Sequence, residues 1–193
     1  MRRTFGILMA TLAAAALTAP ASAQTQGEKL RIEAFAVNMS NIGTGRTNTV
    51  LMEIDRWTTD QQQDELRTAL LEQGSDKLLQ ALQKQPRVGF IRLPNTVGYD
   101  LHYARETALP DGGRRISIAT DRRIGFWEAR NQPRTIDYPF TLIELRVDAN
   151  GKGQGKLSVA SKITYDAELK TITLENYTTE PVRLQNVKVE IKK

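Results

Sequence analysis

The side chains that could do acid–base chemistry gather around one histidine. His102 is the only histidine among 193 residues, and Asp100 and Asp121 are expected beside it. A histidine flanked by carboxylates can accept a proton, with one carboxylate fixing its tautomer. No serine, cysteine or second histidine is expected next to this cluster to supply a nucleophile or a metal ligand. A charged cross-strand ladder therefore explains the cluster better than a catalytic site does.

This cluster depends on a hairpin that turns at Asp111-Gly112. Asp-Gly is favoured in two-residue turns between antiparallel strands. Such a turn would place His102 opposite Asp121 and Asp100 opposite Arg123. The sequence therefore predicts that these four side chains share one surface of the hairpin.

Arginine is concentrated in the same part of the chain. Between Arg87 and Arg134 there are nine arginines and no lysine. Arginine is preferred where a planar fork or stacking on an aromatic ring is useful. One interpretation is a surface for an anionic or carboxylate-bearing ligand, with Arg105, Arg123, Tyr103 and Trp127 as candidate binding residues. Ion pairs within the protein explain these arginines at least as well.

No pattern predicts a metal site or a cofactor. Asp148, Asn150 and Gly153 match three positions of a calcium-binding loop, but Lys152 and Val159 stand where oxygen ligands are needed. The sequence contains no nucleophile elbow, zinc-binding helix motif, phosphate-binding loop or dinucleotide-binding fingerprint.

The N-terminus has the pattern of a secretory signal peptide over residues 1–23. A short cationic start with Arg2 and Arg3 precedes an apolar run from Phe5 to Leu17, and small residues follow at the cleavage positions. The two arginines also partly match the twin-arginine export signal. The apolar run is shorter than the roughly twenty residues that cross a bilayer. We therefore expect a periplasmic or secreted protein with no transmembrane anchor after cleavage.

Charge and composition narrow the function further. The chain has 27 basic and 22 acidic residues, a net charge of +5. Removal of Arg2 and Arg3 leaves 25 basic against 22 acidic residues, a charge of +3. This excess is too slight to predict binding of nucleic acid. The chain has no cysteine, so in an oxidising compartment its stability must come from burial.

Residues 24–193 are expected to form one domain of the α+β class, mainly antiparallel β. From Val88 onward, segments of strand-like pattern follow one another with short turns, which favour antiparallel neighbours. We expect about eight to ten strands in a sandwich or a barrel, two architectures that the pattern does not separate.

One inserted stretch, about residues 59–85, has a helical pattern. Thr59 and Gln62 have the spacing of a capping box, and leucines form narrow apolar stripes. Gly74 is expected to separate two short helices, and Pro86 to end the second. The helical hairpin should cover an edge or an open end of the sheet.

The loop after Asn150 decides how two predicted strands pair. A two-residue turn at Asn150-Gly151 would bring the apolar face of one strand onto the polar face of the next, so a longer loop from Asn150 to Gly153 is expected. Leu145 would then face Leu157, and Ile143 would face Val159, in one dry interior.

In two predicted strands the apolar residues switch from one face of the strand to the other, which predicts an irregularity in each. In the segment from Leu30 to Met39 the switch occurs near Ala34, and either a bulge or burial of both faces of the strand would explain it. In the last segment the switch occurs near Gln185-Asn186, where we expect a β-bulge.

Several motifs resemble a family of secreted bacterial proteins without assigned activity. They are Val88–Arg92, Gly98–Leu101, Tyr103–Arg105, Asp111–Arg115, Ala119–Arg122, Phe126–Glu128 and Asp137–Thr141. The resemblance covers about half the chain, from Arg87 to Glu180. It implies a bacterial exported protein and implies nothing about chemistry.

The sequence thus favours a non-catalytic periplasmic or secreted module that binds a small molecule or an envelope protein, without a cofactor. An apolar cavity enclosed by the strands would favour a hydrophobic ligand. One alternative is a hydrolase or isomerase that uses His102 with Asp100 or Asp121. Another is a structural component of the cell envelope.

Overall fold

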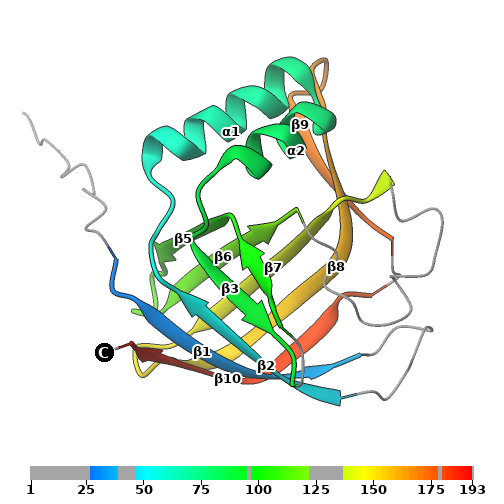
Figure 1. Ribbon diagram of the computed structural model, residues 1–193. Helices are drawn as coiled ribbons and strands as arrows, with labels where there is room; N and C mark the ends of the chain where they lie inside the picture. Colours follow the sequence, from blue (N-terminus) through cyan, green and yellow to red (C-terminus); the bar gives the residue numbers. More distant parts are fainter. Residues whose placement is uncertain (1–26, 39–46, 95–96, 122–136, 178–179, 193) are drawn as a thin grey trace, which may run out of the picture.

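The protein folds as a nearly closed antiparallel β-barrel with two helices (Figure 1). The computed structural model describes residues 27–38, 47–94, 97–121, 137–177 and 180–192. Ten strands in these ranges form one sheet, and every pair of neighbours is antiparallel. The predicted fold class is confirmed, and of the two expected architectures the structure is a barrel.

The strands range from three to fifteen residues in length. They are β1 (Leu30–Val37), β2 (Thr47–Ile54), β3 (Gly89–Arg92), β4 (Tyr99–Leu101), β5 (Tyr103–Ala108), β6 (Arg114–Thr120), β7 (Phe140–Val147), β8 (Lys152–Asp166), β9 (Thr171–Asn176) and β10 (Val182–Ile191). Their order in the sheet is β4-β3-β2-β1-β10-β8-β7-β6-β5, and β9 pairs with β8 outside this path.

The barrel closes where β4 meets β5. These strands stand at the two ends of the sheet order, yet only His102 separates them in the chain. The His102 N–H group donates to the Ala119 carbonyl at 3.2 Å, and the Thr120 hydroxyl donates to the Asp100 carbonyl at 2.7 Å. These bonds connect the β4–β5 junction to β6. We call this junction the seam.

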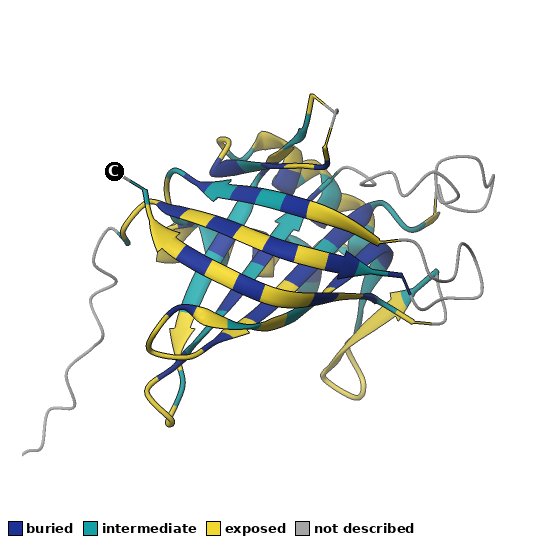
Figure 2. Ribbon diagram, turned by 90° about the horizontal axis from the view of Figure 1, so that it is seen from below, coloured by how far each residue is buried: buried dark blue, intermediate teal, exposed yellow. Residues whose placement is uncertain are grey.

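Alternating side chains give the barrel a dry interior (Figure 2). Ile143, Leu145 and Val159 are each at most 3% exposed and belong to one buried cluster with residues of the other barrel strands. Their predicted place in one core is confirmed. Full burial of one such side chain stabilises the fold by about 1.5–3 kcal/mol. Aliphatic side chains of the described strands thus line the interior.

The helical hairpin is formed by α1 (Asp60–Gln73) and α2 (Ser75–Lys84). The Thr59 hydroxyl accepts the Gln62 N–H at 3.2 Å, and the Gln62 side chain accepts the Thr59 N–H at 2.9 Å. The predicted capping box is therefore present. Gly74, with φ of +79°, separates the two helices as expected.

The hairpin packs where β5 and β7 begin (Figure 1). Its four buried leucines form a second apolar cluster with Phe140, the first residue of β7. Tyr103, the first residue of β5, packs against the same cluster. The apolar stripes of the helices are thus buried against one end of the barrel strands, while their other faces are polar.

The turn between β5 and β6 differs from the predicted one. The Leu109 N–H donates to the Gly113 carbonyl at 2.8 Å, so three residues form the loop. The last of them, Gly112, has φ of +81°. This is a type I turn followed by a left-handed glycine. The predicted register is therefore wrong by one residue, and Tyr103 pairs with Ala119.

The turn between β7 and β8 has the same form. Residues 149–151 make the loop, and Gly151 has φ of +73°. The expectation that this loop is longer than two residues is confirmed. The pairing is shifted by two residues from the predicted one, because Leu145 lies opposite Gly155 and not Leu157. A shift of two keeps each side chain on its predicted face.

One bulge, in β10, accounts for the register shifts beside both places where an irregular strand was predicted. A β-bulge interrupts β10 between Leu184 and Val187, with Asn186 at φ of +49°, as expected. The prediction for the first strand is wrong, because β1 alternates regularly and Phe35 faces outward at 39% exposure. The shift in the pairing of β1 with β10 lies beside Ala34, and the extra residue belongs to β10.

Candidate functional site

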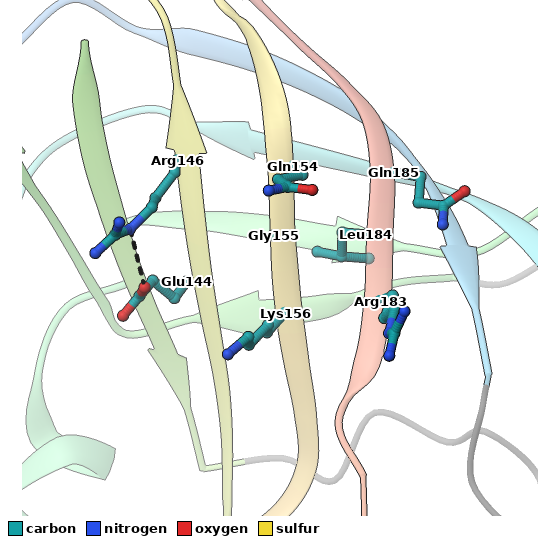
Figure 3. Close-up of a pocket in the computed structure, with 8 residues that line it drawn as sticks. All are labelled: Glu144, Arg146, Gln154, Gly155, Lys156, Arg183, Leu184 and Gln185. Atoms are coloured by element: carbon teal, nitrogen blue, oxygen red, sulfur yellow. Dashed lines mark ion pairs between the residues drawn. The ribbon is translucent and has the colours of Figure 1, made fainter. Parts of the chain in front are cut away.

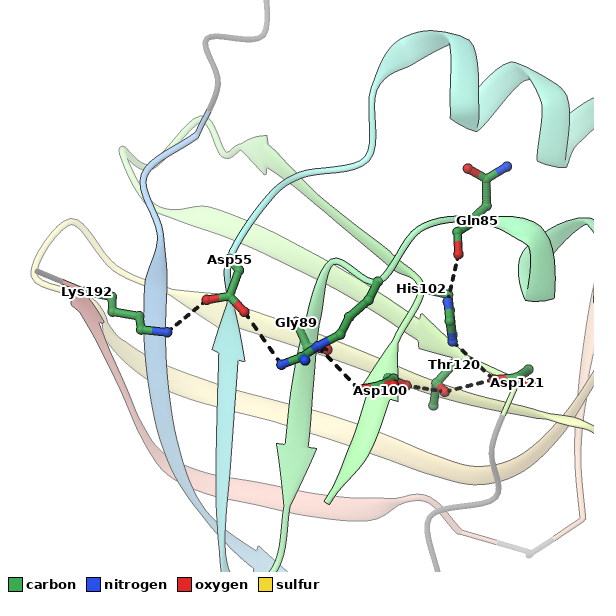
Figure 4. Close-up of polar contacts among 9 residues, drawn as sticks. Asp55, Gln85, Gly89, Asp100, His102, Thr120, Asp121 and Lys192 are labelled. Carbon is green, nitrogen blue, oxygen red and sulfur yellow. Dashed lines mark hydrogen bonds and ion pairs between the residues drawn. The ribbon is translucent and has the colours of Figure 1, made fainter. Parts of the chain in front are cut away.

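His102 lies half-buried in the seam (Figure 4). Its Nδ1 is 3.0 Å from the Gln85 carbonyl oxygen. A carbonyl only accepts hydrogen bonds, so Nδ1 carries a proton. Its Nε2 faces Asp121 Oδ1 at 3.7 Å, and these two side chains are 18% and 12% exposed. Both ring nitrogens thus face protein groups, which favours a structural role for His102 over proton transfer.

Asp100 does not share that arrangement. Its carboxylate is 59% exposed and lies 3.3 Å from Arg87. Arg87 also lies 3.8 Å from Asp55, which accepts a hydrogen bond from Lys192 at 2.8 Å. The structure therefore brings the side chains of His102 and Asp121 together, while the Asp100 carboxylate faces Arg87. The Thr120 hydroxyl links the two groups, because it lies 2.7 Å from the Asp100 carbonyl oxygen and 3.4 Å from Asp121 Oδ1 (Figure 4). The expected partner of Asp100, Arg123, lies outside the described residues.

Arg105 and Tyr103 also have partners inside the protein. Arg105 is 16% exposed, and its guanidinium lies 2.8 Å from Asp60 at the start of α1. The Tyr103 ring packs against the helical hairpin, and burial raises the pKa of its hydroxyl while Arg105 acts in the opposite direction. Both side chains join β5 to the helices. Trp127, the other predicted aromatic, lies outside the described residues.

Within the described ranges, no three His, Asp or Glu side chains are grouped so as to hold a metal ion. The Asp148 carboxylate accepts backbone N–H groups from Asn150 and Lys152 at 2.8 and 2.9 Å. These hydrogen bonds, that from Lys152 above all, lower the pKa of Asp148. Asp148 thus stabilises a turn. No helix in the described part of the chain has the length and apolar character to cross a membrane.

A different surface has unbalanced charge, on the outside of β6, β7, β8 and β10. Arg183 lies directly opposite Lys156, and Arg115 lies directly opposite Arg146. The residues that alternate with them point into the buried core. Glu144, opposite Lys156 and 3.7 Å from Arg146, is the carboxylate that the register places among these cations. We call Arg115, Arg146, Lys156 and Arg183 the cationic face.

The neighbouring outer surface, on β1, β2 and the end of β10, is built differently. Lys188 lies opposite Glu33, and Arg31 lies opposite both Glu190 and Glu53. Lys188 also forms an ion pair with Glu190, whose hydrogen bond raises the pKa of the lysine. Opposite charges thus alternate across β2, β1 and this end of β10, while on its β8 side Lys188 lies opposite Lys152. We call Arg31, Glu33, Glu53, Lys188 and Glu190 the balanced face.

A depression of about 610 Å³ lies over the cationic face (Figure 3). It is lined by Glu144, Arg146, Gln154, Gly155, Lys156, Arg183, Leu184 and Gln185. Gln185 belongs to the β10 bulge, and a bulge bends its strand and increases its twist. The side chains of Lys156 and Arg183 lie on the same side of the sheet. Neither forms an ion pair within the described residues.

A second depression, of about 620 Å³, lies beside the seam. His102 lines it, as an acid–base site would require, but both nitrogens of the ring face protein groups. The guanidinium groups of Arg87 and Arg92 lie 5.6 and 5.9 Å from the centre of the Phe90 ring. Because Arg87 is shared by Asp55 and Asp100, this depression has less uncompensated charge than the one over the cationic face.

Fold and surface together define a small β-barrel protein with a cationic depression on its outer wall. Comparison with protein-family models, with curated proteins and with solved structures finds no match to this chain. The family resemblance of the motifs therefore stays a prediction, and the functional argument rests on the geometry of the protein itself.

Proposed function

We propose that this protein is a non-catalytic binding module that takes an anionic ligand on its cationic face. The observation that carries the proposal is the direct pairing of Arg183 with Lys156. Like charges directly opposite each other destabilise a sheet. On the balanced face, Lys188 also lies opposite a lysine, Lys152, but it faces Glu33 on its other side. Arg183 faces Val37 there and has no carboxylate opposite it. Such an arrangement, unfavourable for the free protein, becomes favourable when an anion lies between the two cations.

The depression fits carboxylate or phosphate groups. Arginine offers a planar fork of N–H donors to such groups, and lysine offers a compact positive charge. The side-chain amides of Gln154 and Gln185 add neutral donors at its margin. A volume of about 610 Å³ suits a small anion or one segment of a longer anionic chain.

The N-terminal pattern supports export, and we place the protein in the periplasm or outside the cell on that basis. The ligand would then be a small molecule or an envelope component that bears carboxylate or phosphate groups. The hydrolase or isomerase alternative is less supported, because both nitrogens of His102 face protein groups. A purely structural role in the envelope would fit a cationic face that binds no anion.

Calorimetric titration tests this proposal. Triglutamate and inorganic phosphate, each titrated separately into the wild type, serve as carboxylate and phosphate probes. Lys156→Gln and Arg183→Gln each remove one cation from the depression, and we expect each to weaken binding about tenfold, because a hydrogen bond to a charged group contributes about 1.5–3 kcal/mol.

Lys188→Gln is the matched control, because it removes the same charge from the balanced face. It should leave the affinity nearly unchanged. If both probes fail to bind the wild type, or if all three variants weaken binding equally, the proposal is wrong. An equal loss would indicate attraction by net charge and no defined site.

A further inference from the structure

β9 is an edge strand with one free side. It pairs with β8 alone, from Asp166 opposite Thr171 to Ser161 opposite Asn176 (Figure 1). Within the described residues, no residue of β9 has a backbone hydrogen bond to a strand other than β8. An edge strand of this kind presents a row of unpaired N–H and C=O groups that can pair with another strand.

One face of β9 carries apolar side chains that are only partly covered. Ile172 lies opposite Tyr165, and Leu174 lies opposite Ile163. Tyr165 and Ile163 pack against the cluster beneath the helical hairpin. Ile172 and Leu174, on the same side of the two-stranded ribbon, are 55% and 49% exposed. The apolar surface thus continues from the covered cluster onto β9 and ends there in solvent.

β9 has few of the protections of a natural edge strand. Natural edge strands carry charged side chains, above all lysine, or proline, contain a bulge, or are very short. The one charged residue of β9 is Glu175, whose carboxylate accepts a hydrogen bond from the Tyr138 hydroxyl. The six residues Thr171–Asn176 include neither lysine nor proline, and their pairing with β8 has no register shift. The two ends of the barrel sheet, β4 and β5, are joined at the seam. Among the described strands, β9 is the edge strand that lies outside the path of the barrel sheet.

We propose that β9 pairs in antiparallel fashion with β9 of a second copy of this chain. In a register centred on Thr173, Ile172 faces Leu174 of the second copy, and Leu174 faces its Ile172. All four exposed apolar side chains then form one cluster on the side that already continues the helical cluster. A two-fold interface requires this self-complementary pattern.

The charges of the strand agree with this register. Glu175 lies opposite Thr171 of the second copy, and Lys170 lies opposite its Asn176. No like charges are paired, in contrast to the cationic face. The proposal is independent of the proposed anion site, because β9 and the cationic face share no residue.

Sedimentation velocity over a range of protein concentrations tests this pairing. We expect the wild type to show a reversible monomer–dimer equilibrium, and Leu174→Lys to be monomeric throughout the range. The substituted side chain is half exposed, so the variant should fold. Val97→Lys, the same kind of change at a fully exposed apolar residue away from β9, is the control and should leave the equilibrium unchanged.

A charge-swap variant tests the register itself. Ile172→Lys alone should be monomeric. The double variant Ile172→Lys/Leu174→Glu should dimerise again, because in the proposed register each introduced ammonium faces an introduced carboxylate of the other copy. A register that places residue 172 opposite itself would instead pair like charges and give a monomer.

Three results would overturn the proposal. They are a wild type that is monomeric at every concentration, a dimer that persists in Leu174→Lys, and a double variant that remains monomeric. A monomeric wild type that binds a strand-forming peptide from another protein belongs to the first case and would assign β9 to a different partner.

Discussion

The imidazole of His102 donates a hydrogen bond from Nδ1 to the backbone carbonyl oxygen of Gln85, over 3.0 Å. Gln85 caps the C-terminal end of α2, and His102 is the residue between β4 and β5. The other nitrogen of the ring faces Asp121, just after β6. One side chain therefore connects the helical hairpin to both sides of the barrel seam.

We predict that His102→Ala lowers the free energy of unfolding by about 1–3 kcal/mol, because it leaves a polar group at the seam without its partner. His102→Asn should lose less, since its amide N–H can take the place of Nδ1–H. Urea unfolding measures both effects. Anion binding should be unchanged in both variants. A His102→Ala protein that is as stable as the wild type would contradict the structural role.

The two hairpin glycines provide a second prediction. Gly112 and Gly151 both have left-handed backbone conformations, with φ of +81° and +73°. A left-handed conformation costs an L-residue about 1–2 kcal/mol, and a Cβ at Gly112 would meet no atom within 4 Å. A Cβ at Gly151 would lie 2.5 Å from the Val189 carbonyl oxygen. Gly151→Ala should therefore destabilise the protein more than Gly112→Ala in urea unfolding, and equal losses would contradict this account.

Local patterns in the sequence were sufficient to predict the helical hairpin and the buried face of β7, though not the regular alternation of β1. The spacing of Thr59 and Gln62 indicates the start of the helical hairpin, because the capping box involves only neighbouring residues. Alternation places Ile143 and Leu145 inside the barrel, because successive side chains of a strand point to opposite faces. These inferences require no knowledge of which strands are neighbours.

Strand register and the candidate site could not be predicted in the same way. A left-handed glycine adds one residue to the Asp111-Gly112 turn, and both turn lengths are compatible with the sequence. The cationic face depends on β10 lying beside β8, which places Arg183 opposite Lys156. Hydrophobic periodicity does not specify the order of strands in a sheet. The arginine cluster drew attention to Arg105, which instead pairs with Asp60.

Acid should weaken the β7–β8 turn through Asp148. Hydrogen bonds from Lys152 and Asn150 N–H groups lower the pKa of this carboxyl below its ordinary value of 3.8. The ionised form is therefore favoured in the folded protein. Its contribution to stability is complete above the ordinary pKa and is lost as the pH falls through the lower folded-state pKa.

Asp148→Asn, which removes the charge and keeps an acceptor oxygen, isolates this contribution. The unfolding free energies of wild type and variant should differ most above about pH 5 and converge in stronger acid. Urea unfolding at a series of pH values measures the difference. A difference that stays constant with pH would show that Asp148 does not act through its charge.

The cationic face predicts a trade-off between stability and binding. Arg183→Glu replaces a like-charge pair with Lys156 by an opposite-charge pair, so we expect it to raise the free energy of unfolding by a few tenths to about 1 kcal/mol at low salt. The same variant should lose affinity for triglutamate and phosphate, because a carboxylate then occupies the depression. Few substitutions of a surface cation are expected to stabilise a protein while abolishing its binding.

Lys188→Glu is the control, because it makes the same change of charge on the balanced face. There the new carboxylate faces Glu33 and adjoins Glu190. It gains one opposite charge, Lys152 on β8, but loses both favourable partners of Lys188, so stability should fall. Both effects should shrink in 1 M salt, where the screening length is about 3 Å. If Arg183→Glu and Lys188→Glu change stability in the same direction, then the pairing of Arg183 with Lys156 is not unfavourable, and the main support for an anion site on this face is removed.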